Sequence, residues 1–318
     1  MKFRNLLMIG GSGLLGSHLA HRLSTQGINL RLPTRRRERA KHLLPLPTAE
    51  VIEADVSDPA ALARLMAGQD AVINLVGILA GGSGQPYGRG FSSAHVELPQ
   101  KIVAAMQAAG VHRLLHVSAL KAAADAPSGY LRSKAAGEAV VLGARNIDTT
   151  VFRPSVIFGA GDGFLNLFAG LLRNAPFLPL ACPNARFQPV WVENVASCMA
   201  MSLSQPESLG RTYDLCGPHP YTLRQLVEYV GTVTGHRRPL IGLPDALSYL
   251  QAWAMEYVPG VPMSRDSYFS MQIPSLCEAG CSLPFGVAPT ALEAVAISYL
   301  TDGRARARND EFRAKARR

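Results

Sequence analysis

The sequence lacks the features that would place it among membrane-spanning, disordered or secreted proteins. No apolar stretch reaches the roughly 18 uninterrupted residues that a membrane-spanning helix needs. Charged residues make up only 17% of the chain and hydrophobic residues 48%, which is typical of a folded protein and not of a disordered one. Glycines interrupt the first apolar run soon after it begins, so this run predicts a strand and not a signal peptide.

Cysteine is also scarce, and its pattern argues against a disulfide framework. The count of five is odd, and the spacing is scattered. Cys277 and Cys281 are four residues apart, but no histidine or second cysteine pair lies nearby to complete a zinc site. We therefore expect reduced thiols, no metal and a reducing cytoplasm. The cysteines are Cys182, Cys198, Cys216, Cys277 and Cys281.

Positive charge gathers at one end of the chain. The net charge is +9, and residues 304–318 hold seven basic and two acidic residues, a net charge of +5. Because the rest is only mildly basic, no nucleic-acid surface is predicted. The simplest interpretation of this tail is a solvated chain end. The alternative is that it binds an anionic membrane surface or a partner in a respiratory complex, which would place the protein in the cytoplasm or peripheral to the inner membrane.

Short apolar runs alternate with helical patterns over the first half of the chain. This alternation predicts an α/β fold whose parallel sheet is covered on both faces. The rhythm is lost after residue 154, where proline becomes denser. We expect a first domain at 1–154, a smaller mixed region at 155–303 with some chain returning to the sheet, and the tail at 304–318. The expected strands are 6–9, 30–32, 51–54, 71–76, 114–117 and 149–152, and the expected late helices are 192–203, 223–234, 245–257 and 291–299.

A glycine-rich loop joins the first expected strand to the first expected helix. Gly10, Gly13 and Gly16 give the spacing GxxGxxG. Small residues let the backbone approach a pyrophosphate, and the helix amino terminus offers free N–H groups and a partial positive charge. The loop therefore predicts a dinucleotide site of the Rossmann type. The expected contacts are Gly10, Ser12, Gly13, Leu14, Leu15 and Gly16.

The end of the second strand bears on which nicotinamide cofactor is bound. A carboxylate there would hold the ribose 2′-hydroxyl of NAD, but the chain has Thr34, Arg35 and Arg36 and no acid before Glu38. Arginine forks pair well with a 2′-phosphate, so the sequence favours NADP and leaves NAD open. The competing interpretation is a solvated basic turn.

Two further strand ends are candidates for cofactor contacts. Asp55 and Val56 end the third strand, where adenine contacts are common. Asn74, Val76 and Gly77 end the fourth strand, along which the cofactor ribose would pass. Each of these could also be an ordinary strand end.

Tyr130 and Lys134 form a YxxxK pair at the start of a helix. Residues four apart share one helical face. A nearby ammonium lowers the pKa of a phenol, so Tyr130 is expected to exchange a proton with a substrate oxygen while Lys134 holds the nicotinamide ribose. Ser118, at the end of the fifth strand, is the candidate hydroxyl that would polarise the substrate; the alternative is that it only caps the strand end.

These residues together resemble the short-chain dehydrogenase/reductase superfamily, in its extended or atypical branch. The stretches 116–120, 130–138 and 243–265 are similar to one subgroup, the nucleotide-binding accessory subunit of respiratory complex I and its bacterial relatives, described as NAD-dependent epimerase/dehydratase-like. The resemblance implies a Rossmann-type doubly wound parallel sheet with a smaller C-terminal region. It also implies that Val117 and Pro154 contact the cofactor, and that the mitochondrial relative holds NADPH in a structural role.

One departure from the resemblance leaves two functions open. Extended members place a catalytic serine or threonine two positions after the first serine that follows the fifth strand, and that position here is Leu120. The first hypothesis is an NADP-preferring oxidoreductase or epimerase/dehydratase-type enzyme acting on an unknown small molecule, with sugar nucleotides, quinones and small carbonyls all open. The second is a catalytically silent NADPH-binding accessory protein of a membrane respiratory complex. The helix at 245–257 is expected to be buried, with an opening toward a quinone or lipid tail as the alternative.

Overall fold

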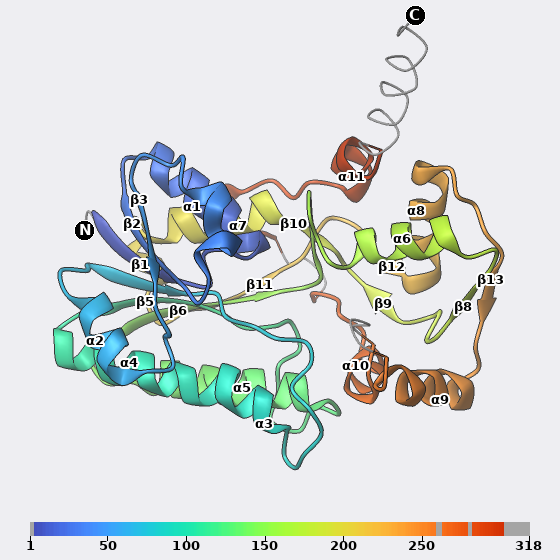
Figure 1. The fold of residues 1–318 in the computed structure, drawn as a ribbon, viewed down its shortest axis with the longest axis horizontal. Coiled ribbons are helices and arrows are strands. Elements are labelled where there is room, and N and C mark those ends of the chain that lie inside the picture. Colours follow the sequence, from blue (N-terminus) through green and yellow to red (C-terminus); the bar gives the residue numbers. More distant parts are fainter. Residues whose placement is uncertain (1–2, 259–262, 279–281, 302–318) are drawn as a thin grey trace, which may run out of the picture.

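The chain forms a seven-stranded parallel sheet with helices on both faces (Figure 1). The computed structural model describes residues 3–258, 263–278 and 282–301. The strand order is β11-β6-β5-β4-β1-β2-β3, so the order reverses between β1 and β4. The expected fold class is confirmed. The strands of this sheet are β1 (Asn5–Ile9), β2 (Asn29–Thr34), β3 (Ala49–Glu53), β4 (Ala71–Asn74), β5 (Arg113–Val117), β6 (Asp148–Pro154) and β11 (Thr212–Leu215).

Each face of the sheet buries its own set of apolar side chains. Leu6 and Met8 of β1 pack into one cluster, and Leu7 and Ile9 pack into another on the opposite face. Two-sided burial explains why the strands appear in the sequence as uninterrupted apolar runs. One face is covered by α1 (Leu14–Thr25) and α7 (Val192–Ser202), and the other by α2 (Pro59–Met66), α4 (Leu98–Ala109) and α5 (Gly129–Leu142).

A π-helical turn precedes α4. The short helix α3 (Arg89–Phe91) continues through this turn, Ser92–Glu97, into α4 without a break. Such turns re-aim side chains and occur frequently at functional sites. Here the turn contains His95, which is 2% exposed and packs against α5.

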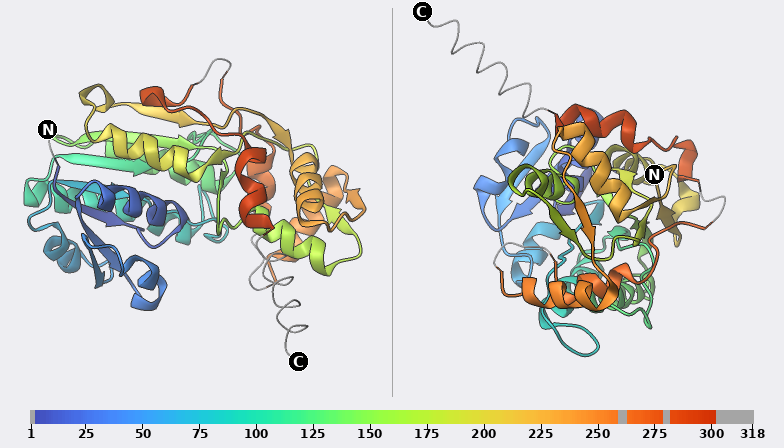
Figure 2. Two further views of the ribbon diagram at one scale, coloured as in Figure 1. Left: turned by 90° about the horizontal axis from the view of Figure 1, so that it is seen from above. Right: turned by 90° about the vertical axis from the view of Figure 1, so that its right-hand side faces the viewer.

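Part of the second half of the chain returns to the sheet, as expected. β11 pairs with β6 in parallel, and α7 packs beside α1. The rest forms a smaller body beside the carboxyl edge of the sheet (Figure 2). Its helices are α6 (Leu165–Asn174), α8 (Leu223–Thr234), α9 (Asp245–Met255), α10 (Arg265–Met271) and α11 (Leu292–Leu300). Its strands pair as β7 (Ile157–Phe158) with β10 (Val190–Trp191), β8 (Leu178–Leu180) with β13 (Leu240–Gly242), and β9 (Arg186–Phe187) with β12 (Tyr221–Thr222).

A disulfide joins Cys216 to Cys277, so the expectation that the cysteines are all reduced thiols is wrong. The two residues are 61 apart in sequence, but both flank Gln188. The Gly217 N–H donates to the Gln188 carbonyl, and the Cys277 N–H donates to the Gln188 side chain at 3.1 Å. An odd count does not prevent one such tertiary pair. Cys198 and Cys182 are free, and Cys281 lies outside the described residues.

The described residues contain neither a membrane-spanning helix nor a cluster of metal-binding side chains. None of their helices combines the length and apolar composition required to cross a bilayer. In the same ranges, no three histidine, cysteine, aspartate or glutamate side chains gather in a way that could hold a metal ion.

Candidate functional site

The carboxyl ends of the parallel strands bring the candidate residues to one edge of the sheet. β1, β2, β4 and β5 run in the same direction, so the segments that follow them emerge side by side. Between β1 and β4 the strand order reverses, and their carboxyl ends diverge into loops on opposite faces. In open α/β sheets, ligands bind in the crevice at such a reversal.

The loop at Gly10 packs closely against the end of β4 and the start of α1. Gly10 has a φ of +86°, and a Cβ atom there would lie 3.2 Å from the backbone of Leu75. A Cβ atom at Gly16 would lie 2.6 Å from the Gly10 carbonyl oxygen, so α1 approaches the loop only because residue 16 lacks a side chain. No side chain caps the amino terminus of α1, and its first turn contains no acid. The free N–H groups there suit an anionic pyrophosphate.

The end of β2 presents unpaired cations. Arg35 and Arg36 are exposed, and neither has an acidic partner within ion-pair distance among the residues that the structure describes. The buried Thr34 hydroxyl donates to the Arg36 carbonyl at 3.0 Å and holds the turn in shape. The hydrogen bond from the backbone N–H of Ser57 lowers the pKa of Asp55, and the positive charge of Arg35 lowers it further. A 2′-phosphate would meet free guanidinium groups at this turn.

Hydrogen bonds of the buried Asn74 side chain fix the end of β4. The Asn74 side chain is 1% exposed, contacts His116 Nδ1 at 3.2 Å and accepts the Val76 N–H at 3.2 Å. Its polar atoms therefore shape the strand end, and the surface that follows is formed by partly buried Val76 and exposed Gly77. A Cβ atom at Gly77 would lie 3.1 Å from Lys134 Nζ, so glycine leaves room for the ammonium group.

Lys134 lies beneath this edge. It is 3% exposed, and Nζ donates to the carbonyl oxygens of Val76 and Val117 at 3.3 and 3.2 Å. Burial lowers the pKa of Lys134 to about 8, and Glu138 opposes that shift. Glu138 forms a second link between α5 and the sheet through its ion pair with Arg153 of β6.

Tyr130 stands in an aromatic corner formed by Phe91 and His95, whose ring centroids lie 6.1 and 5.6 Å from its own. Burial raises the pKa of Tyr130 to about 12, and the carboxylate of Asp266 acts in the same direction. The expectation that the pKa of Tyr130 would be lowered is wrong for the chain without a ligand, because burial and the negative charge of Asp266 both raise it.

Two residues near Tyr130 gave no sequence signal. The Asp266 carboxylate of α10 accepts the N–H of Gly129 at 2.6 Å and of Tyr130 at 3.1 Å, and thereby caps α5 from the second region. His95 Nε2 accepts the Ile78 N–H at 3.1 Å, and its Nδ1 contacts the Ser133 hydroxyl at 2.8 Å. Burial lowers the pKa of His95 to about 3, so the ring is neutral. Neither residue belongs to a local motif, because the contacts of His95 span 17 and 38 positions of sequence and that of Asp266 with Gly129 spans 137.

Ser118 has an unused hydroxyl. The residue is 3% exposed, and its Oγ has no hydrogen-bond partner within the described residues. Its backbone N–H donates to the Phe152 carbonyl, while Leu120 is buried and its N–H donates to the Pro154 carbonyl. An orphaned buried hydroxyl beside the Lys134 contact at Val117 is a polar atom that a ligand could satisfy.

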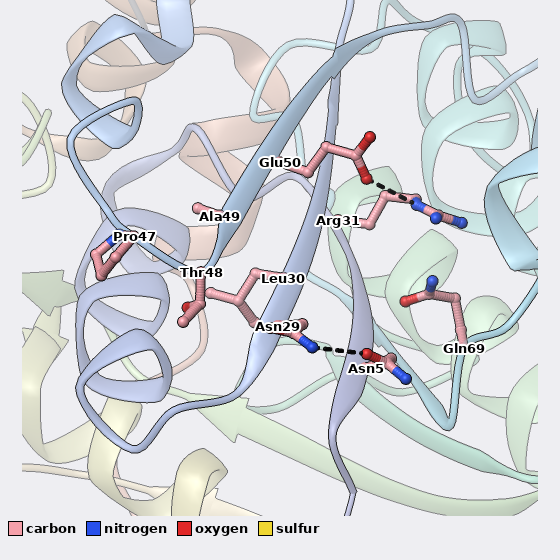
Figure 3. A pocket seen from close by; sticks show the side chains of 9 residues that line it. All are labelled: Asn5, Asn29, Leu30, Arg31, Pro47, Thr48, Ala49, Glu50 and Gln69. Atoms are coloured by element: carbon pink, nitrogen blue, oxygen red, sulfur yellow. Dashed lines mark hydrogen bonds and ion pairs between the residues drawn. The ribbon is translucent and has the colours of Figure 1, made fainter.

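A separate hollow of about 320 Å³ lies at the opposite edge of the sheet (Figure 3). Asn5, Asn29 and Ala49, which begin β1, β2 and β3, line it, and Arg31 reaches across to Glu50 at 3.4 Å. It is therefore distinct from the crevice at the carboxyl ends, where the glycine loop, Lys134 and Tyr130 lie.

The sheet order and the glycine loop at its reversal point define a dinucleotide-binding α/β protein. A model of the NAD dependent epimerase/dehydratase family matches residues 6–216. The chain belongs to this family, and the resemblance seen in the sequence is confirmed. Its ligand is a nicotinamide dinucleotide.

Relatives by sequence are of two kinds. The chain is 32% identical over 228 residues to "NADH dehydrogenase [ubiquinone] 1 alpha subcomplex subunit 9, mitochondrial" of Arabidopsis thaliana, covering 70% of this chain and 56% of the relative. The rat protein of the same name is 31% identical, with 72% and 61% covered. The chain thus spans less than two thirds of these relatives. It is also 30% identical over 252 residues to "Ceramide reductase" of Caulobacter vibrioides, covering 77% of each.

Solved structures share the fold at low sequence identity. A UDP-glucuronic acid 4-epimerase from Bacillus cereus, determined with UDP-glucuronic acid and NAD, has a TM-score of 0.71 at 16% identity and covers 93% of this chain and 99% of its own. MoeE5, determined with UDP-glucuronic acid and NAD, has a TM-score of 0.64 at 20% identity, covering 75% and 85%. At these identities the likeness supports the fold alone.

Proposed function

We propose that this protein is an NADP-preferring oxidoreductase that transfers a hydride between the cofactor and the carbonyl or alcohol carbon of a small molecule. The observation that carries the proposal is the pair on α5, partly buried Tyr130 and buried Lys134, placed beside the unused Ser118 hydroxyl at the carboxyl edge of the sheet. Arg35 and Arg36 support the preference for a 2′-phosphate, because they are exposed and unpaired within the described residues.

The residues of the glycine loop would hold the pyrophosphate through the backbone of residues 10–16 and the amino terminus of α1. Lys134 would hold the nicotinamide ribose, since its Nζ already reaches the ends of β4 and β5. Backbone at Asp55, Val56, Val76, Gly77 and Pro154 would complete the groove. When bound, the nicotinamide supplies or accepts the hydride.

Tyr130 is suited to donate a proton. Its pKa of about 12 keeps the phenol protonated at neutral pH, which is the form required to protonate an oxygen during carbonyl reduction. A cationic nicotinamide would lower this pKa in the complex and favour the reverse step. The Ser118 hydroxyl would hydrogen-bond the same substrate oxygen in place of the side chain missing at Leu120.

The second candidate is a catalytically silent NADPH-binding accessory protein of a membrane respiratory complex. It is favoured by Leu120, which is buried at the position where extended relatives carry a hydroxyl, and by the similarity to the complex I subunit. The reductase relative covers more of its own length, and the intact α5 pair favours chemistry. We therefore place the enzyme first.

Hydride transfer distinguishes the two candidates. The wild-type protein would be mixed with NADPH and a panel of nucleotide sugars, quinones and ketones with short or long chains, while the absorbance of reduced nicotinamide is followed near about 340 nm. The enzyme predicts oxidation by at least one compound, loss of turnover in Tyr130→Phe, and unchanged NADPH affinity in that variant. Tight NADPH binding without oxidation by any compound would favour the accessory protein, and turnover that survives in Tyr130→Phe would remove this residue from the mechanism.

A further inference from the structure

Helix α9 exposes an apolar face, although the sequence predicted that this helix would be buried. Ser248 and Ala252 are on its packed side, and Ser248 Oγ accepts the Cys182 N–H at 3.1 Å. The opposite face carries Leu250 and Trp253, which are 52% and 42% exposed. Tyr257 follows the helix, is 70% exposed, and its ring lies 5.5 Å from that of Trp253. A surface helix of a soluble domain normally presents polar side chains on that face.

The apolar surface continues from α9 onto the small sheet of β8 and β13. The Gln251 side chain donates to the Pro179 carbonyl at 3.3 Å, which holds α9 against β8. Ile241 is the register partner of Pro179, and both are exposed. Phe177 directly precedes β8 and is 48% exposed. The six apolar side chains, together called the distal patch, are Phe177, Ile241, Leu247, Leu250, Trp253 and Tyr257.

Three exposed arginines lie close in sequence to Phe177 and Ile241 of the distal patch. Arg173 ends α6, and Arg237 and Arg238 lead into β13. Arg238 Nε donates to the Leu172 carbonyl at 3.1 Å, which brings the two segments together. None of the three guanidinium groups has an acidic partner within ion-pair distance in the described ranges.

The acids near α9 cancel only part of this charge. Glu256, which follows α9, is neutralised by Arg265 at 3.0 Å. Asp245 keeps its charge, because its hydrogen-bond partner, Tyr268 of α10, is uncharged, so one carboxylate stands against three arginines. The elements α6, α8, α9 and β13 lie at the end of the molecule farthest from the seven-stranded sheet (Figure 1). This end combines exposed apolar side chains with three arginines.

We propose that the distal patch docks this protein onto the surface of an anionic lipid bilayer. Leucine, isoleucine and phenylalanine side chains would enter the acyl boundary, tryptophan and tyrosine would lie at headgroup depth, and the arginines would contact lipid phosphates. A second copy of the chain is the less suitable occupant, because a two-fold contact through this patch would bring two sets of unpaired arginines together. The arrangement does not depend on residues 304–318, which lie outside the described residues, or on the proposed hydride transfer.

Vesicle binding tests the proposal without any need for turnover. The full-length protein would be sedimented with vesicles of pure phosphatidylcholine and with vesicles that also contain phosphatidylglycerol. We expect binding to the anionic vesicles, weakened by salt. Leu247→Glu combined with Leu250→Glu should reduce it by about tenfold, because two exposed side chains no longer enter the apolar layer. In the matched control, Ile297→Glu changes an equally exposed apolar residue of α11 and should leave binding unchanged.

Two further measurements identify the contact. The chain has two tryptophans, so Trp191→Phe leaves Trp253 as the only one, and its emission should shift to shorter wavelength when anionic vesicles are added. Arg173→Gln combined with Arg237→Gln should weaken binding to anionic vesicles and leave binding to neutral vesicles unchanged. The proposal is overturned if the wild type does not bind, or if the double glutamate variant binds as tightly as the wild type. It is also overturned if the patch mediates a dimer that the glutamate variant dissociates while vesicles have no effect.

Discussion

Replacing Asp266 by asparagine should loosen the start of α5 and change the titration of Tyr130. The carboxylate accepts two backbone N–H groups at the helix amino terminus, at 2.6 and 3.1 Å, and it is attracted to the positive end of the helix dipole. Asparagine keeps an acceptor but loses the charge, which should cost about 1 kcal/mol of the free energy of unfolding. The melting temperature would fall by about 2–4 °C.

The same substitution should lower the pKa of Tyr130 below its present value of about 12, because Asp266 contributes to raising it. The melting temperature and the pKa of Tyr130 should thus both change because the substitution removes the negative charge of Asp266. The measurements are thermal denaturation and NMR of ζ-carbon-labelled tyrosine across alkaline pH, with the Tyr130 resonance assigned through Tyr130→Phe. In the matched control, Asp125→Asn removes an exposed carboxylate that contacts no N–H group in the described residues. An Asp266→Asn protein with unchanged melting temperature and unchanged Tyr130 titration would refute the reasoning.

Three other outcomes follow from the site. Changing Arg35 and Arg36 to alanine should weaken NADPH binding about tenfold to a hundredfold and leave NADH within about twofold, as calorimetry would show. Burial lowers the pKa values of His95 and His116 to about 3 in the folded chain. Below pH 6.5 the unfolded chain therefore binds more protons than the folded chain, which favours unfolding. Urea titrations should show the free energy of unfolding falling by about 1.4 kcal/mol per pH unit for each histidine as the pH decreases toward 4. Gly16→Ala should abolish binding of both nucleotides, because its Cβ atom meets the Gly10 carbonyl.

Each of these outcomes has a matched control. Arg64→Ala removes an exposed cation of α2 away from the crevice and should leave NADPH affinity unchanged. For the acid titration, His95→Gln should remove one histidine's share of the pH slope, whereas replacing exposed His21 should not. Gly163→Ala adds a Cβ atom into open space and should bind both nucleotides normally. Equal loss of NADPH and NADH in the arginine variant would contradict the assignment to a 2′-phosphate.

Short sequence patterns predicted those strands, helices and loops whose structure depends on residues close together in the chain. The strands of the sheet bury both faces, so their apolar runs could be recognised without a partner. The glycine spacing and the helix that follows β1 are encoded within seven residues, and the tight contacts of Gly10 and Gly16 supply the physical reason. The helices at α7, α8 and α11 were expected within a residue or two of their bounds.

Long-range contacts were beyond sequence reasoning. Asp266 caps α5 from 137 positions away, and the Cys216–Cys277 disulfide depends on how Gln188 holds two distant segments. The pKa of Tyr130 was expected to fall because only its helical neighbour Lys134 was visible, whereas burial and Asp266 act through the folded structure. The exposed face of α9 was expected to be buried because its apolar composition does not reveal which side packs.

The cofactor measurement tests the central claim most directly. The purified protein would be treated to extract any bound nucleotide for mass spectrometry, and the emptied protein titrated with NADPH and with NADH while nicotinamide fluorescence is followed. We predict saturable binding with one nucleotide per chain and an affinity for NADPH at least about tenfold above that for NADH, as two guanidinium contacts to a phosphate imply. Equal affinity would contradict the NADP preference, and no saturable binding of either nucleotide would contradict the proposed site itself.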